Sequence, residues 1–311
     1  MRAVGIVAAA VLGLACSAAQ AAVEQRGTVQ VQGREHTFSM VLPDAAASGG
    51  RYPIVMALHG GGGNGRRAAT ISGLGRHVDR EGFIAVFPDA GGRPWNDGRE
   101  TTRGFTGDVA SLRAVVQKVV ETSNGDPNRV FVMGISNGGM MVQRLACEAP
   151  DVFRAYAALV GNLPTALSAS CKPGRPVPIV LMSGTDDRLM PFQGGDLPQA
   201  AGRRRDGAGV GGRVMSAPAS VQFWSRVNNC QKETTEALPD RKEDGTQVTM
   251  HRFAGCQSGG EVVFYEIKGG GHNWPGGAGP RRPRLQRLIG NVSQEIDATS
   301  VILDFFRRYG L

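Results

Sequence analysis

The sequence predicts an α/β fold, with a mostly parallel central sheet and helices on both of its faces. Two observations indicate this fold. Strand-like and helix-like stretches alternate along the chain, which is typical of parallel strands joined by crossover helices. Some strand-like stretches, such as 54–58 and 131–133, are apolar throughout, as expected of strands that are covered on both faces.

The expected elements follow the chain in this order. Apolar stretches, many of them β-branched, predict strands at 37–42, 54–58, 83–87, 130–133, 156–160, 177–182 and 261–267. Helical stretches lie between most of them, at 67–81, 108–122, 138–147, 220–228 and 298–308. The stretch 194–212 contains seven glycines and three consecutive arginines without an apolar period, so we expect a surface loop there.

The composition is that of a globular protein. Of the 311 residues, 41% are hydrophobic and 20% are charged, which excludes a disordered chain, a collagen and a coiled coil. No internal repeat and no linker rich in Pro, Ser or Thr separates a second module. We therefore expect a single domain over residues 22–311.

The first 21 residues have the pattern of a secretory signal peptide, with a charged start, an apolar stretch at 3–15 and a small-residue cleavage motif at 19–21. The apolar stretch is too short to cross a membrane, which needs roughly 20 residues. Cys16 would be the lipid anchor of a lipoprotein signal, but Gly13 stands where such a signal has a branched apolar residue. We expect cleavage after Ala21 and a secreted protein, periplasmic or extracellular, without a membrane span.

Export to an oxidising compartment allows the remaining cysteines to form disulfides. These are Cys147, Cys171, Cys230 and Cys256. Three pairings are possible, and we favour nearest neighbours, Cys147 with Cys171 and Cys230 with Cys256, each closing a loop of about 25 residues worth roughly 3 kcal/mol. No cysteine has the spacing of a metal ligand, and we expect no metal and no cofactor.

The formal net charge is +8, and two arginine clusters, at 203–205 and 281–287, account for part of it. Such clusters can bind nucleic acid or another anionic polymer. Neither cluster is interleaved with aromatic residues, and both lie in stretches rich in Gly or Pro. We therefore expect solvated loops and no nucleic-acid partner.

The sequence Gly134-Ile135-Ser136-Asn137-Gly138 is a G-x-S-x-G motif. It directly follows an expected strand and precedes an expected helix, which is the setting of a nucleophile elbow. The glycines on each side are needed because the tight turn holds the serine at a strained backbone angle and leaves no room for neighbouring Cβ atoms. The alternative is an ordinary turn of small residues.

A serine nucleophile needs a base to accept its proton and an acid to orient that base. Of the five histidines, His272 is the best base candidate, since it lies in a glycine-rich loop directly after the last expected strand. Asp186 and Asp187 both follow the strand expected at 177–182. Spacing alone does not choose between them, but the order Ser, Asp, His is that of α/β-hydrolase triads.

A glycine-rich turn, His59 to Gly63, follows the strand expected at 54–58. The N–H of Gly61 or Gly62, together with the N–H of Asn137, can form an oxyanion hole. A phosphate cradle is the competing interpretation, but the Gly-x₄-Gly-Lys-Ser/Thr pattern is absent. We expect a structural role for His59, whose ring would hold the turn.

With these residues, the chain resembles the secreted polyhydroxybutyrate depolymerase-like esterases, which are similar to the feruloyl and acetylxylan esterases of carbohydrate esterase family one. The matching segments span nearly the whole mature chain: 58–61, 95–96, 126–139, 145–147, 184–191 and 270–276. In this family the acid lies four residues before the proline of a G-T-x-D-x-x-x-P turn. Pro191 fixes that register, and the resemblance therefore selects Asp187. The chain departs from the family at Ser183 and Phe192, where His and Tyr are common.

The resemblance implies an α/β-hydrolase fold over 22–311 and metal-free ester hydrolysis by Ser136, His272 and Asp187. We expect an ester substrate of the 3-hydroxybutyrate oligomer or polyester type. One alternative is a feruloyl or acetylxylan esterase, and another is a non-catalytic binder of an anionic polymer. Trp95 and Trp274 are candidates to stack on a substrate ring, or else packing residues.

Overall fold

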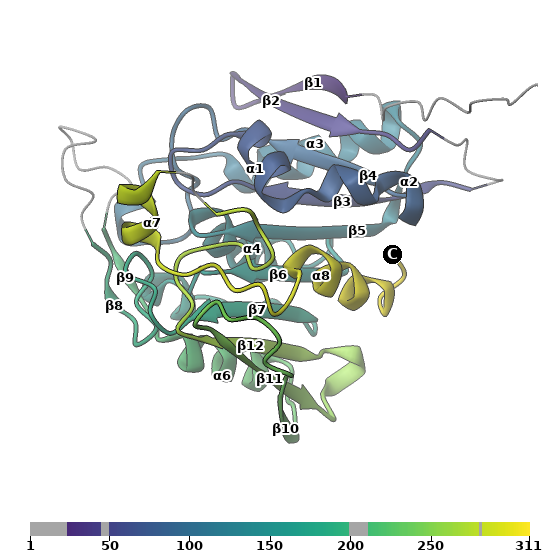
Figure 1. Ribbon diagram of the computed structural model, residues 1–311. Helices are drawn as coiled ribbons and strands as arrows, with labels where there is room; N and C mark the ends of the chain where they lie inside the picture. Colours follow the sequence, from purple (N-terminus) through teal and green to yellow (C-terminus); the bar gives the residue numbers. More distant parts are fainter. Residues whose placement is uncertain (1–23, 45–49, 199–210, 280–281) are drawn as a thin grey trace, which may run out of the picture.

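The computed structural model describes residues 24–44, 50–198, 211–279 and 282–311. In this part of the chain the central sheet has ten strands, in the order β1-β2-β4-β3-β5-β6-β7-β12-β11-β10 (Figure 1). The six strands from β4 to β12 in this order pair in parallel, and the outer strands on each side are antiparallel. The signal peptide predicted at 1–21 lies outside the described residues.

The parallel strands are β4 (Ile84–Pro88), β3 (Tyr52–Leu58), β5 (Gly125–Ile135), β6 (Ala155–Leu159), β7 (Ile179–Gly184) and β12 (Val262–Lys268). The outer strands are β1 (Glu24–Val31), β2 (Arg34–Val41), β11 (Gln247–Ala254) and β10 (Lys232–Ala237). A strand exists at each predicted stretch. Three further strands of this sheet, β1, β10 and β11, lie outside those stretches. β11 falls on an alternating stretch of the sequence, whereas β1 and β10 lack such a signal, because β10 is exposed at every residue and β1 at most of its residues.

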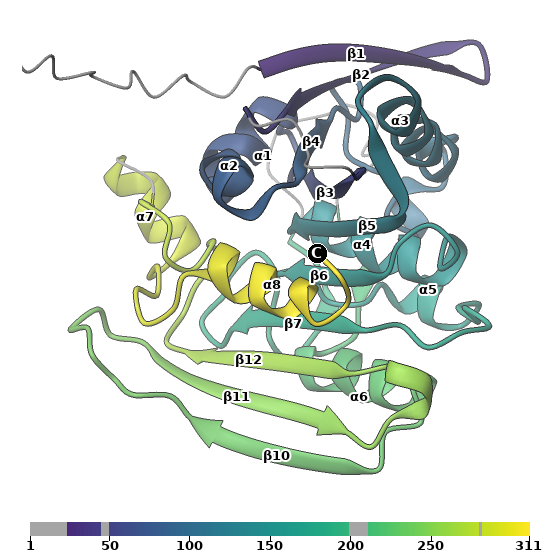
Figure 2. The same ribbon diagram turned by 90° about the vertical axis from the view of Figure 1, so that its right-hand side faces the viewer.

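Helices cover both faces of the sheet, as the sequence predicts. One face carries α3 (Asp108–Thr122), α4 (Asn137–Glu148), α5 (Thr165–Ser168) and α6 (Ala217–Val227), and the other carries α1 (Gly65–Ser72), α2 (Val78–Glu81) and α8 (Ala298–Arg307) (Figure 2). Each face of the sheet has its own hydrophobic core, and alternate residues of a strand pack into one core or the other. In β3, Ile54 and Met56 pack toward α3 and α4, whereas Val55 and Ala57 pack toward α1 and α8.

The helix predicted at 67–81 is two helices. α1 ends at Ser72 and is capped by Gly73, whose φ of 59° lies in the left-handed region, and a short 3₁₀ turn (Leu74–His77) then leads into α2. Because residues other than glycine are strained at this angle, Gly73 is a helix terminator that the apolar pattern alone does not reveal.

The loop predicted at 194–212 lies mostly outside the described residues. The short strand β8 (Gly195–Asp196) lies at its start and pairs antiparallel with β9 (Arg213–Val214), which directly follows it. The first arginine cluster, 203–205, is not described. Arg282, Arg284 and Arg287 of the second cluster are exposed as expected, but they start or lie on a short helix, α7 (Pro283–Ile289), rather than in a loop.

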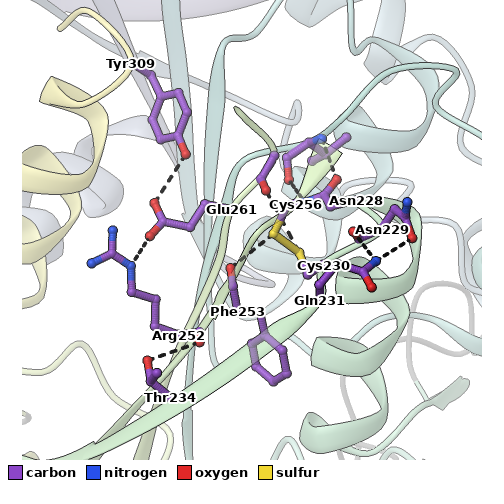
Figure 3. The surroundings of a disulfide bond; sticks show 12 residues. Asn228, Asn229, Cys230, Gln231, Thr234, Arg252, Phe253, Cys256, Glu261 and Tyr309 are labelled. Atoms are coloured by element: carbon purple, nitrogen blue, oxygen red, sulfur yellow. Dashed lines mark hydrogen bonds and ion pairs between the residues drawn. A yellow bond between two sulfur atoms is a disulfide. The ribbon is translucent and has the colours of Figure 1, made fainter. Parts of the chain in front are cut away.

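Both favoured disulfides are present. Cys147, near the end of α4, is bonded to Cys171, and Cys230, after α6, is bonded to Cys256 in the turn after β11. Figure 3 shows the second bridge beside Asn228, whose buried amide exchanges two hydrogen bonds of 2.7 Å with the backbone of Val177 before β7. The bridge therefore closes the base of the β10–β11 hairpin, and Asn228 beside it joins this end of the hairpin to the parallel core. In the described residues, no helix combines the length and apolar character needed to cross a membrane.

Candidate active site

The G-x-S-x-G motif forms the predicted strand–turn–helix. β5 ends at Ile135, Ser136 has φ 58° and ψ −122°, and α4 begins at Asn137. A Cβ on Gly134 would lie 2.5 Å from the carbonyl oxygen of Gly138, and a Cβ on Gly138 would lie 2.5 Å from the carbonyl oxygens of Leu58 and His59. The close backbone packing thus explains why both positions are glycine, and the serine is in the strained conformation of a nucleophile elbow.

Asp187 and His272 are in direct contact. Asp187 Oδ2 accepts a hydrogen bond of 2.7 Å from His272 Nδ1, and Asp187 Oδ1 accepts two bonds of 2.8 Å from the N–H groups of Leu189 and Met190. The Asp187 side chain is 1% exposed and that of His272 is 11% exposed. Because the carboxylate only accepts, it holds the proton of His272 on Nδ1 and leaves Nε2 as the acceptor of the ring.

Asp186, the other aspartate that spacing left open, is exposed. Its carboxylate accepts a bond from the hydroxyl of its neighbour Thr185, and within the described residues the hydrogen bond of His272 Nδ1 goes to Asp187 and not to Asp186. The geometry therefore agrees with the aspartate that the family register selects.

Ser136, Asp187 and His272 follow β5, β7 and β12, whose carboxyl ends lie at the same edge of the parallel sheet. In the described residues, Ser136 Oγ and the His272 ring share no hydrogen bond. Catalytic hydrogen bonds are often long without substrate and shorten in the Michaelis complex. The structure thus joins Asp187 to His272 and places Ser136 at the same edge of the sheet.

Asn273, which the sequence analysis did not select, fixes the histidine loop. Its Nδ2 lies 3.0 to 3.1 Å from the carbonyl oxygens of Ile289, Gly290 and Asn291. Gly271 N–H donates to the carbonyl of Asn291 at 2.9 Å, and a Cβ on Gly271 would lie 2.0 Å from the carbonyl oxygen of Ile289. The glycines before His272 therefore permit close packing against the segment after α7.

The glycine turn after β3 lies against the elbow. Gly63 N–H donates to Gly60 C=O at 3.0 Å, and Gly62 has φ 70°, as a β-turn of this kind requires. A Cβ on Gly61 would lie 3.8 Å from the Cβ of Asn137, so these two candidate oxyanion donors are neighbours. Asn137 is the first residue of α4, and the first N–H groups of a helix have no acceptor within it.

His59 holds this turn, in agreement with the role expected from the sequence. Its Nε2 accepts a bond of 3.2 Å from Ala90 N–H, so the proton lies on Nδ1, which donates to Gly60 C=O at 2.8 Å. Burial is the main cause that lowers the pKa of His59, and the ring is thus neutral.

The stacking role expected for the two tryptophans is wrong, and the packing alternative holds. Trp95 is 0% exposed, and its Nε1 donates to the carbonyl oxygen of His59 at 3.0 Å. Trp274 is 6% exposed, and its Nε1 donates to Thr299 Oγ1 at 3.1 Å in the core beneath α8. Neither indole offers a free face to a substrate ring.

Comparisons with known proteins identify the family of the chain. Residues 36–172 match the profile of the family described as "Esterase PHB depolymerase". The chain is 30% identical over 286 residues to "Putative esterase NocK" of Nocardia uniformis subsp. tsuyamanensis, covering 89% of this chain and 80% of NocK. The chain belongs to this esterase family. It is a carboxylic ester hydrolase, which overturns the alternative of a non-catalytic binder.

Other relatives of this esterase family member have named substrates. The chain is 26% identical over 242 residues to "Acetylxylan esterase" of Coprinopsis cinerea, covering 72% of this chain and 62% of the relative. It is 28% identical over 198 residues to "Feruloyl esterase B" of Piromyces equi, covering 62% of this chain and 34% of that longer protein.

A solved structure confirms the predicted α/β-hydrolase fold. It is "Acetyl xylan esterase from Aspergillus awamori", which superposes with a TM-score of 0.58 at 16% identity, covering 85% of this chain and 98% of that chain. At this identity the likeness concerns the fold alone.

Proposed function

We propose that this esterase uses Ser136 as nucleophile, His272 as general base and then general acid, and Asp187 as the group that orients the imidazole. The observation that carries the proposal is the 2.7 Å bond between Asp187 Oδ2 and His272 Nδ1, at the sheet edge that also holds the Ser136 elbow. In the neutral imidazole this bond places the proton on Nδ1, which leaves the Nε2 lone pair to accept the serine proton.

The reaction has two steps. Ser136 Oγ attacks the ester carbonyl carbon while His272 Nε2 takes the hydroxyl proton, and the carbonyl electron pair moves onto the oxygen. The tetrahedral intermediate collapses, the ester C–O bond breaks, and His272 protonates the leaving alkoxide. Water then attacks the acyl-enzyme in the same way, which releases the acid and restores Ser136. Asp187 stabilises the imidazolium formed in each step.

The N–H groups of Asn137 and Gly61, with Gly62 as the alternative glycine, are proposed to stabilise the oxyanion. The proximity of Gly61 to Asn137 and the position of Asn137 at the start of α4 support this assignment. Loss of one such donor typically lowers kcat by about 10²- to 10³-fold.

The proposed substrate is an ester of the 3-hydroxybutyrate oligomer or polyester type. The family description supports it, and so does the burial of Trp95 and Trp274, which leaves no indole to stack on a phenolic ring. The large hydrophobic side chains that are exposed in the described residues are aliphatic, Leu285 and Leu288 of α7. A feruloyl or acetylxylan ester is the second candidate, because curated relatives carry those names.

We also propose that the protein is secreted to the periplasm or outside the cell. The charged and apolar pattern of residues 1–21 supports this, and the two disulfides are of a kind that persists in oxidising compartments.

The test compares Ser136→Ala with Ser170→Ala, a change at an exposed serine after α5. Purified mature protein is assayed on p-nitrophenyl acetate, 3-hydroxybutyrate trimer, methyl ferulate and acetylated xylan. We expect Ser136→Ala to lose activity and fluorophosphonate labelling, and Ser170→Ala to retain both. Substantial activity in Ser136→Ala would overturn the mechanism, whereas faster hydrolysis of methyl ferulate or acetylated xylan than of the trimer would overturn the substrate alone.

A further inference from the structure

A buried chain of hydrogen bonds connects the two segments that are proposed to stabilise the oxyanion. One segment begins α4 at Asn137, and the other is the glycine turn after β3. They belong to distant parts of the sequence, and Trp95 lies between them with no exposed surface. The reaction mechanism above assigns no role to this residue.

Two hydrogen bonds join the backbone of Trp95 to the side-chain amide of Asn137, and we call this pair of bonds the clasp. Trp95 N–H donates to Asn137 Oδ1 at 2.8 Å, and Asn137 Nδ2 donates to Trp95 C=O at 3.0 Å. Asn137 is 3% exposed, so both bonds lie away from water. A paired amide of this kind fixes the position of the first residue of α4 and, with it, the direction of its N–H.

The indole of Trp95 contacts the other segment. Its Nε1 donates to His59 C=O at 3.0 Å. The centroids of the Trp95 and His59 rings are 4.9 Å apart. The His59 ring in turn donates to Gly60 C=O at 2.8 Å. One tryptophan thus holds the asparagine with its backbone and the glycine turn with its side chain.

The clasp is supported from behind by a buried ion pair. Asp97 is 0% exposed and accepts a bond from Asn137 Nδ2, while Arg99, 4% exposed, pairs with Asp97 at 2.8 Å. Thr102 Oγ1 donates to Asp97 Oδ1 at 3.1 Å. Because a buried carboxylate is stable only when its acceptors are occupied, this arrangement resists displacement of the loop that carries Trp95.

We propose that Trp95 is a positioning residue that sets the spacing between the oxyanion donors, the N–H of Asn137 and the N–H of Gly61. Oxyanion stabilisation depends on donors that are already in place when charge develops. A shift of one donor therefore reduces the stabilisation of the transition state more than it reduces the binding of the substrate. The inference rests on the proposed function, because it assumes that Ser136 attack creates the oxyanion.

The test replaces Trp95 by Phe, which retains a buried ring and removes the indole N–H. Trp224→Phe is the matched control, since Trp224 is also 0% exposed and loses a comparable bond, 2.8 Å long, to Gln143. We measure kcat and KM on p-nitrophenyl acetate, the Ki of a trifluoromethyl ketone that forms an oxyanion on the serine, and the thermal midpoint. For Trp95→Phe we expect kcat to fall by about 10- to 100-fold with KM changed less than twofold, and Ki to rise in proportion.

Trp224→Phe is expected to lower the thermal midpoint while kcat and Ki stay within about twofold. Equal kcat losses in the two variants, or a Trp95→Phe loss that occurs in KM with unchanged Ki, would overturn the inference. Asn137→Ala, which cuts the same clasp but keeps the backbone N–H, provides the same readouts if Trp95→Phe does not fold. If Ser136→Ala remains active, the proposed function fails; if Ser136→Ala is inactive and Trp95→Phe behaves like its control, only this inference fails.

Discussion

Replacing Asp187 by Asn tests the acid of the proposed triad with little change in shape. The wild-type carboxylate accepts three bonds, two at Oδ1 from Leu189 and Met190 and one at Oδ2 from His272. The amide can keep the first two by placing its oxygen at Oδ1. The NH₂ group of the amide then faces His272. This group only donates, so it cannot accept a hydrogen bond from the Nδ1–H of His272.

The expected loss follows from this mismatch. To bond with the amide, the imidazole must carry its proton on Nε2, the atom that has to accept the Ser136 proton. A wrong tautomer of this kind lowers kcat by about 10⁴-fold, which corresponds to roughly 5.5 kcal/mol of transition-state stabilisation. Stability should fall less, by about 1.5–3 kcal/mol, because one charge-assisted hydrogen bond is lost.

The assay measures kcat/KM on p-nitrophenyl acetate and the free energy of unfolding in urea. Asp186→Asn is the control, because this neighbouring carboxylate is exposed and accepts from the Thr185 hydroxyl at 2.8 Å. We expect Asp186→Asn to keep kcat/KM within about twofold. Retention of more than a tenth of the activity in Asp187→Asn, or an equal loss in Asp186→Asn, would refute the assignment of the acid.

Two further predictions concern the packing and titration of the site. Gly138→Ala places a Cβ 2.5 Å from two backbone oxygens, so we expect about 1–3 kcal/mol lower stability in urea and at least tenfold lower kcat. Gly104→Ala, with no atom within 4 Å of its Cβ, should change stability by less than about 0.5 kcal/mol, and similar effects of the two changes would contradict the steric argument. Burial lowers the pKa of His59 below its ordinary value of 6.5, as it also does for His36 and His77. The unfolded chain then binds protons at a higher pH than the folded chain, so the stability from this group is complete above pH 6.5 and is lost as the pH falls below it. His59→Asn should make unfolding midpoints between pH 7.5 and 5 less dependent on pH than in wild type, and an unchanged slope would argue against a neutral buried ring.

The parallel core was predictable because its strands are covered on both faces, so Ile54 to Leu58 had to be apolar at every position. The outer strands were harder. β10 has charged and threonine side chains at most positions and buries none of them, so neither alternation nor hydrophobicity distinguishes it from a loop. Its pairing with β11 decides its structure, and that information is not local.

In the candidate site, too, the features set by local sequence were predictable and those set by distant residues were not. The elbow was predictable because strand, serine and helix are contiguous, whereas Asp186 and Asp187 differ only in which side chain turns inward. For Trp95 the sequence left two roles open, stacking on a substrate ring or packing, because the residues that decide between them are distant along the chain. Trp95 is buried because His59 and Asn137, far from it along the chain, satisfy its polar groups.

The exposed strand β10 also has a consequence for assembly. Among the described residues it is the last strand of the sheet and pairs on one side only, with β11, and such edges are the feature by which β proteins recruit another chain. Lys232, Glu233 and Glu236 stand along it, and an incoming strand would have to accommodate these charges beside its own side chains. The charges of β10 therefore discourage pairing of this edge with a strand of another chain.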